Sequence, residues 1–165
     1  MTSDFEVRRA VASDAAAMAR VHVDTWRETY RGLMRDAVLD DPALLGWREK
    51  FWNAVLTDPR FSNNAVAVAT RDAALLGIAM AGPSLDGAAE SVQLHVLYVY
   101  GAFHGTGVGS VLLNAVIDPA APASLWVADP NPRAQAFYRK HGFDSDGTVK
   151  VDDGLREIRM VRETS

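Results

Sequence analysis

Three glycines at alternate positions mark the part of the chain best suited to bind a ligand. Gly105, Gly107 and Gly109 follow a β-branched and aromatic run that ends at Val99, and an apolar segment with a helical pattern comes next. Glycine permits tight turns and lets the backbone come close to a ligand. The free N–H groups and the positive dipole end at the start of a helix attract anions. Residues 94–113 therefore predict a phosphate-binding site.

Two common phosphate-binding motifs do not fit this stretch. A nucleoside-triphosphate loop needs Lys and then Ser or Thr after its last glycine, whereas Gly109 is followed by Ser110 with no Lys nearby. The dinucleotide fingerprint, counted from Gly105 or from Gly107, needs a glycine where the chain has Ser or Leu. Both kinds of site are set aside.

The segment HGTGVG resembles the acyl-CoA loop of the GNAT superfamily of N-acetyltransferases. The usual pattern of that loop is Gln or Arg, two residues, Gly, one residue, and then Gly or Ala. Gly107 and Gly109 occupy the last two of these positions, and His104 stands where Gln or Arg is commoner. A second block, LWVADPNPRAQAFYRKHGF at residues 125–143, resembles the later strand, Asn-initiated helix and closing Gly-Phe of the family. Two blocks in this order and spacing make the resemblance specific.

The resemblance implies an acetyl-CoA-dependent N-acetyltransferase similar to those that act on small molecules in bacteria. Two neighbouring strands, residues 93–99 and 125–128, are then splayed so that the pantetheine arm binds between them like an added strand. The residues implied to bind acetyl-CoA are Leu97, Tyr98, Val99, His104, Gly105, Thr106, Gly107, Val108, Gly109, Ser110, Asn131, Phe137 and Tyr138. Asn131 is also explained as a helix cap, because Pro132 follows it.

Tyr138 is the general acid that the resemblance implies. In the family the matching Tyr points at the sulfur of CoA and protonates the departing thiolate. The reference pKa of a phenol, near 10, is close to that of a thiol, near 8.5. A hydrogen bond from the phenol can therefore stabilise the charge that develops on the departing sulfur. A core aromatic residue with a locally satisfied hydroxyl is the structural alternative.

His95 is the candidate base for the acceptor amine. An alkylammonium group with a pKa near 10.4 is only about 0.04% deprotonated at pH 7, which costs roughly 4 to 5 kcal/mol without assistance. Strand alternation predicts that Gln93, His95 and Leu97 share a face, with His95 about 7 Å from the thioester-contacting position. From there a neutral imidazole accepts the proton through a water. Two alternatives stay open. His95 is a half-buried residue with a packing role only, or the proton leaves along waters without a dedicated base.

The segment VHVDTWRETYRG, which holds His22 and Arg27, resembles the wall of the acceptor site in bacterial small-molecule acetyltransferases. The residues implied to contact the acceptor are Trp26, Glu28, Tyr30 and His95. Aromatic side chains spaced by four residues are also typical of helix core packing. Glu28, together with an acidic group made of Asp36, Asp40 and Asp41, either attracts a polyamine or aminoglycoside or forms solvated surface.

Composition narrows the class of protein further. The 165 residues include no cysteine, which excludes disulfides and an acyl-cysteine intermediate and so favours direct transfer in a ternary complex. A net charge of −4 without a basic stripe argues against nucleic-acid binding. The DSDG run at residues 144–147 lacks the spacing of a calcium loop, so no metal is expected. No apolar run reaches the roughly 20 residues that cross a bilayer, so a cytoplasmic location is expected.

The elements that must position these residues are expected to form a single domain over residues 1–165. Strands are predicted at residues 5–9, 65–70, 75–81, 91–99, 125–128, 149–151 and 155–160, and helices at about 13–30, 42–56, 107–117 and 131–141. This order gives an α/β fold with a mixed sheet. The resemblance implies a mostly antiparallel sheet, splayed between its fourth and fifth strands and flanked by about four helices.

Two other functions stay open at this point. A non-catalytic acyl-CoA-binding or regulatory module would keep the phosphate site but lack an acceptor site, and the presence of Tyr138 argues against it. Acetylation of protein N-termini or lysines would need an open groove rather than a closed, aromatic-walled cleft. Dimers are common in the family, so both a monomer and a homodimer remain open.

Overall fold

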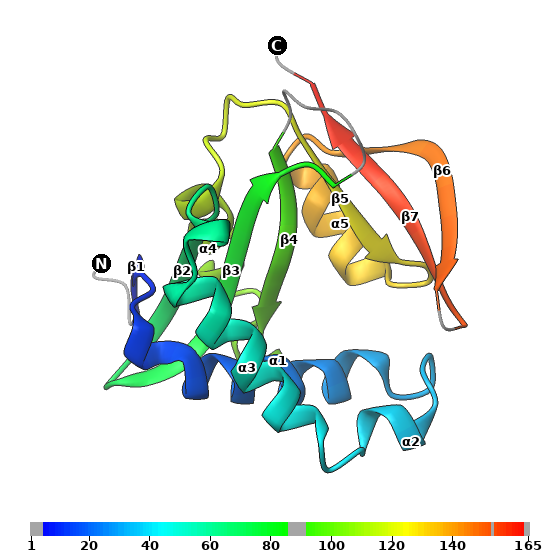
Figure 1. The fold of residues 1–165 in the computed structure, drawn as a ribbon. Coiled ribbons are helices and arrows are strands. Elements are labelled where there is room, and N and C mark those ends of the chain that lie inside the picture. Colours follow the sequence, from blue (N-terminus) through cyan, green and yellow to red (C-terminus); the bar gives the residue numbers. More distant parts are fainter. Residues whose placement is uncertain (1–4, 86–91, 153, 164–165) are drawn as a thin grey trace.

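The computed structural model describes residues 5–85, 92–152 and 154–163. Within these ranges one sheet has the strand order β1-β2-β3-β4-β5-β7-β6, and β4 and β5 form its parallel pair (Figure 1). In chain order the strands are β1 (Glu6–Arg9), β2 (Ala65–Arg71), β3 (Ala74–Pro83), β4 (Val92–Val99), β5 (Ala123–Ala128), β6 (Asp144–Asp152) and β7 (Leu155–Arg162). The predicted mixed α/β fold with a mostly antiparallel sheet is confirmed.

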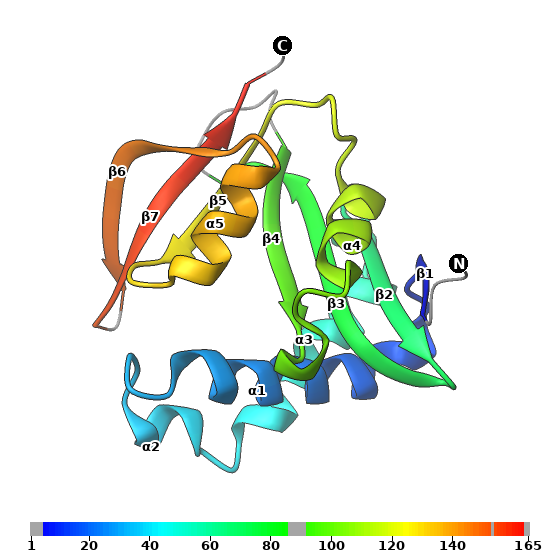
Figure 2. The same ribbon diagram turned by 180° about the vertical axis from the view of Figure 1, so that it is seen from behind.

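Helices cover both faces of the sheet (Figures 1 and 2). Helices α1 (Ala15–Tyr30) and α3 (Leu44–Thr57) cover one face, and α4 (Val108–Val116) and α5 (Pro132–Lys140) cover the other. The alternation of β2 shows why both faces are apolar: Val66 and Val68 pack toward α1 and α3, whereas Ala67 and Ala69 pack toward α4. None of the described helices is both long and apolar enough to cross a membrane.

Short helical turns complete the described chain. The one-turn helix α2 (Asp36–Leu39) lies between α1 and α3 and was not expected from the sequence. Three 3-10 turns are η1 (Ala12–Asp14), η2 (Pro59–Phe61) and η3 (Gly101–Phe103). Of these, η3 connects β4 to the glycines that precede α4.

Strands β4 and β5 separate after three residue pairs. Val92, Gln93 and Leu94 pair with residues 123–125 of β5, and beyond them the strands diverge (Figure 1). Residues 95–99 of β4 have no strand partner on that side in the described part of the chain. This is the predicted splay between the fourth and fifth strands, and it leaves backbone hydrogen-bonding groups facing the opening.

A β-bulge at His95 changes which side chains share a face of β4. Leu94 and Val96 oppose neighbouring residues of β3, so His95 is an extra residue between them. Leu94 consequently packs in the same core as Leu97, and Gln93 lies on the opposite face. The prediction that Gln93, His95 and Leu97 share a face was wrong, because a bulge shifts the alternation by one residue.

Strand β6 differs most from the sequence prediction. It begins at Asp144 rather than at residue 149, and all its residues are exposed, so no apolar alternation marks its start. Strand β5 also begins earlier, at Ala123 rather than at residue 125. The predicted strand start at residue 91 lies outside the described residues.

Candidate functional site

A cavity of about 930 Å³ lies at the opening between β4 and β5. At one end its lining includes Gly105, Gly107, Gly109 and Ser110, which lie before and within the start of α4, whereas Thr106 and Val108 are not part of the lining. Phe137 and Tyr138 of α5 line it on the same face of the sheet. On the other face the lining comes from α1, α3 and Tyr98 of β4. The cavity therefore connects the two faces of the sheet through the splay.

The start of α4 is a candidate anion site built on two left-handed glycines. Gly105 has a φ of 78° and Gly107, the residue before the helix, a φ of 92°, a region that favours glycine. A Cβ at either position would meet no atom within 4 Å, so it is the backbone conformation rather than crowding that favours glycine here. The amides of residues 108–110 form the first turn of α4 and lack intrahelical acceptors. Open space next to these amides suits a phosphate group.

Close packing of α4 against α5 fixes the position of this site. A Cβ on Gly109 would come within 3.3 Å of the Phe137 ring, so glycine lets the two helices approach. The hydroxyl of Ser110 lies 3.0 Å from Nε2 of His141 at the end of α5. The Ser110 side chain is thus engaged with α5, and its backbone amide is the group left to meet a ligand.

His104 holds an arginine beside the glycines instead of facing the anion site itself. Its Nε2 lies 2.9 Å from the carbonyl oxygen of Val99 and therefore donates to it. Its Nδ1 then accepts a hydrogen bond from the guanidinium of Arg133 on α5. Arg133 lines the cavity and is exposed there. A guanidinium next to helix amides adds the charge-assisted contact that phosphate oxygens favour.

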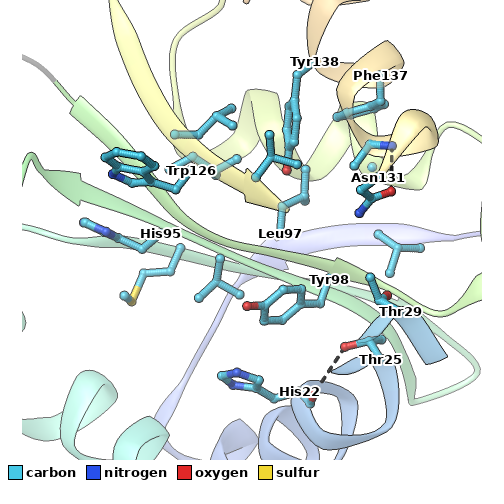
Figure 3. Close-up of a pocket in the computed structure, with 18 of the residues that line it drawn as sticks. His22, Thr25, Thr29, His95, Leu97, Tyr98, Trp126, Asn131, Phe137 and Tyr138 are labelled. Atoms are coloured by element: carbon cyan, nitrogen blue, oxygen red, sulfur yellow. Dashed lines mark hydrogen bonds between the residues drawn. The ribbon is translucent and has the colours of Figure 1, made fainter. Parts of the chain in front are cut away.

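Helix α5 places Tyr138 in the cavity. The helix begins at Pro132, and the side-chain oxygen of Asn131 caps it by accepting the amide of Ala134 at 3.3 Å. Tyr138 is buried, and its hydroxyl points from α5 toward β4, where Leu97 lies (Figure 3). No described group hydrogen-bonds to this hydroxyl. Burial raises the pKa of Tyr138, so the phenol stays protonated and acts as a donor.

Aromatic side chains form the wall of the cavity on the α1 and α3 side. The His22 ring centroid lies 5.3 Å from that of Trp26 and 4.9 Å from that of Tyr98. Tyr30 packs edge to face on Trp26 at 5.6 Å, and the Arg48 guanidinium lies 4.3 Å from the Trp26 ring centroid. Burial lowers the pKa of His22 to about 3, so its imidazole is neutral.

The acidic residues named from the sequence lie outside the cavity lining. Glu28 accepts a hydrogen bond of 3.1 Å from a backbone amide of η3 and so ties α1 to the chain before α4. Asp36 and Asp40 both form ion pairs with Arg31 at the surface, and Asp41 accepts a hydrogen bond from the amide of Ala43 just before α3. The structure therefore separates these carboxylates from Trp26 and Tyr30, which do line the cavity.

Two side chains that can accept a proton, His95 and Glu157, also line the cavity. His95 projects from the bulge of β4 near Trp126 of β5 (Figure 3). Glu157 of β7 is half-buried, and burial raises the pKa of its carboxyl even though Lys150 lies 4.0 Å away. No three His, Asp or Glu side chains among the described residues are placed to hold a metal ion.

Sequence reasoning named none of the charged side chains in the described cavity lining, among them Arg48, Arg133 and Glu157. Arg133 lies inside the second resembling block, two residues after Asn131, so that block held a signal for it. Arg48 and Glu157 lie on α3 and β7, far in sequence from both blocks. Only the folded arrangement brings them to the cavity.

Comparison with known proteins adds a family to this geometry. A family model described as the acetyltransferase (GNAT) family matches residues 18–143. A probable N-acetyltransferase of Mycobacterium tuberculosis is 29% identical over 150 residues, 88% of this chain and 83% of that protein. An uncharacterised N-acetyltransferase of the same species is 38% identical over 116 residues, 66% of this chain and 70% of that protein.

A solved structure supports the fold. The crystal structure of the PaiA N-acetyltransferase of Thermoplasma acidophilum, in complex with coenzyme A, matches with a TM-score of 0.73 at 19% identity and covers 100% of both chains. The family match runs from α1 through both resembling blocks and so includes the α4 glycines and Tyr138. The chain therefore belongs to the acetyltransferase (GNAT) family and is an acyltransferase.

Proposed function

We propose that the protein transfers an acetyl group from acetyl-CoA to a primary amine of a small molecule, by direct attack in a ternary complex. One observation carries the proposal: a single cavity joins the α4 anion site, Tyr138 and an aromatic wall on the opposite face of the sheet. The two substrates can then approach from opposite faces and meet at the splay. Holding both reactants in one cavity replaces a collision in solution by an oriented encounter.

The α4 anion site is proposed to bind the diphosphate of acetyl-CoA. The amides of residues 108–110, the open glycines and the Arg133 guanidinium together offer donors and positive charge to such a group. Residues 95–99 of β4 offer backbone groups to the pantetheine amides. When bound, acetyl-CoA supplies a thioester-activated acetyl group. Leu97, Tyr98 and Val99 would orient that end of the molecule.

Tyr138 is proposed as the general acid. Its hydroxyl is buried, protonated and without a described hydrogen-bond partner, and it points toward Leu97 of β4 (Figure 3). A phenol held there donates a hydrogen bond to a departing thiolate. Because this donor matters most as charge develops, it lowers the barrier rather than improving binding.

Two side chains are proposed as alternative acceptors for the proton of the amine. His95 lies at the bulge, and Glu157 faces the cavity from β7. The raised pKa of Glu157 brings this carboxylate closer to the range in which a base works near neutral pH. A pH–rate profile of each variant shows which of the two is the base, because only loss of the true base removes the acidic limb. The variants are His95→Ala and Glu157→Gln.

A small acceptor is favoured over a protein. The acceptor end of the cavity is walled by side chains of α1, α3 and β4, including Trp26, Phe51 and Tyr98. Such a wall suits a compact ligand, whereas a protein terminus or a lysine needs an open groove.

A thiol-release assay with acetyl-CoA and a panel of primary amines tests this function, with calorimetry of CoA binding alongside it. Saturable thiol release that depends on an amine and yields its N-acetyl product is the expected result. CoA binding with no amine-dependent release would favour a non-catalytic module. Acetylation confined to peptides would move the acceptor to a protein.

A further inference from the structure

Among the described residues, two hydrogen-bond donors in the wall formed by α1 and α3 have no acceptor. His22 is 4% exposed, and its Nδ1 accepts a hydrogen bond of 3.1 Å from Trp52, so its proton is on Nε2. Among the described residues nothing accepts from this Nε2, and nothing accepts from the buried Nε of Arg48. Both side chains line the cavity. Buried donors without a partner are rare and call for an explanation.

Arg48 is also a cation without an anion. It lies on α3 over the ring of Trp26, and no carboxylate of the described chain lies within ion-pair distance of it. Burial lowers the pKa of Arg48, but a guanidinium starts so far above neutrality that it stays charged. A half-buried charge of this kind is stabilised once an oxyanion reaches it.

Basic side chains outnumber acidic ones in the described lining of the cavity, and one of them, Arg60, is paired with Asp58 at 2.7 Å. The charged side chains in the described lining are Arg48, Arg60, Arg133, Lys140, Lys150 and Glu157. Glu157 is the one carboxylate among them, and it lies near Lys150 on the far side. A polyamine or aminoglycoside would therefore meet more positive than negative charge. An acceptor that carries an anion beside its amine fits this lining better.

We infer that the acceptor is a small amino carboxylate, an amine that also bears a carboxylate, and that Arg48 and Nε2 of His22 bind that carboxylate. The inference rests on the proposed function and names its acceptor class. The planar fork of a guanidinium matches the two oxygens of a carboxylate, and the imidazole N–H adds a third donor. Arg48 is thus a specificity-determining residue, whereas Tyr138 acts on the other substrate.

Matched acceptors test this inference. The common amino acids, their carboxamides and their decarboxylated amines are compared in the thiol-release assay. Amidation makes the amine less basic and so favours its attack, which means that a preference for the acid does not come from amine basicity. We expect kcat/KM for the best amino acid to exceed that of its carboxamide by about 10- to 100-fold.

Variants connect that preference to Arg48. Arg48→Gln should raise the KM of the amino acid by about 10-fold or more and lower kcat/KM of the carboxamide much less, so the preference for the acid disappears. Lys50→Gln removes the same charge from an exposed position of α3 outside the cavity and should keep the preference. Arg48→Lys keeps the charge without the fork and should fall between wild type and Arg48→Gln. Thermal melting of each variant separates lost folding from lost recognition.

The outcomes separate the inference from the proposed function. Equal efficiency for acids and carboxamides, or a preference that Arg48→Gln leaves intact, overturns the inference while amine acetylation stands. Absence of turnover with every acid, carboxamide and amine, despite CoA binding, overturns both. A preference for the acid that disappears in Arg48→Gln and persists in Lys50→Gln supports the inference.

Discussion

The indole nitrogen of Trp52 donates a hydrogen bond of 3.1 Å to Nδ1 of His22, and both rings are buried between α1 and α3. Burial lowers the pKa of His22 to about 3. In the unfolded chain the pKa is about 6.5, so on acidification the unfolded state binds the proton first. His22 therefore removes stability as the pH falls from about 6.5 toward 3, by about 2 kcal/mol at pH 5.

Denaturant titrations at pH 7.5 and pH 5 measure this loss. His22→Gln keeps an acceptor for Trp52 but does not titrate, so its free energy of unfolding should fall less between the two pH values. His141, whose pKa is also lowered by burial, contributes equally to both proteins and cancels in the comparison. The same pH dependence in wild type and variant would show that His22 is not the group responsible.

Tyr138→Phe tests the general acid. Removing the phenol should lower kcat by about 100-fold or more, the usual contribution of a positioned acid. The KM for acetyl-CoA should change little, because the hydroxyl acts as charge develops rather than in binding. Steady-state kinetics with an acceptor that the enzyme acetylates measure both kcat and KM. An unchanged kcat would remove Tyr138 from the chemistry.

Arg133→Ala tests the cation beside the α4 glycines. Loss of one charge-assisted contact should raise the Kd of CoA by about 10-fold, and the difference from wild type should shrink at high salt. Arg139→Ala is the matched control, since it removes the same charge from an exposed position in the last turn of the same helix. Calorimetry with CoA and with dephospho-CoA shows whether the lost contact is to the diphosphate. An equal rise in the Kd of CoA in both variants would mean that Arg133 acts only through the overall charge and does not contact CoA.

Two glycine substitutions should change stability in opposite directions. Gly107→Ala forces a Cβ into a left-handed backbone with a φ of 92° and should cost about 1 to 2 kcal/mol. Gly46→Ala lies within α3, where a Cβ meets no atom within 4 Å, and should add about 0.5 to 1 kcal/mol. Urea unfolding at pH 7.5 measures both. Stabilisation by Gly107→Ala would contradict the backbone account of the anion site.

The sequence predicted the fold well where local patterns determine structure. Glycines before an apolar segment predicted the start of α4, and Asn131 followed by Pro132 predicted the start of α5, because these signals act within a few residues. The first half of the exposed strand β6 and the short helix α2 carry no apolar periodicity and were missed, whereas the end of β6 was predicted at residues 149–151. A single domain over residues 1–165, a cytoplasmic location and a homodimer stay predictions.

The candidate site was more predictable on the acetyl-CoA side than on the acceptor side, where the sequence pointed to Trp26, Tyr30 and His95 but not to Arg48 or Glu157. The α4 glycines and Tyr138 lie in two contiguous blocks, so their spacing could be read directly. The acceptor side is assembled from α1, α3, β4 and β7, and contacts such as Arg48 over Trp26 depend on helix packing. The bulge at His95 depends on pairing with β3, which strand alternation alone cannot reveal.

A crystal structure with bound coenzyme A would show directly whether the start of α4 holds its diphosphate. We expect the diphosphate against the amides of residues 108–110, beside Arg133, with pantetheine along residues 95–99 of β4 and the sulfur next to the Tyr138 hydroxyl. Coenzyme A bound away from the start of α4, or with its sulfur remote from Tyr138, would contradict this expectation.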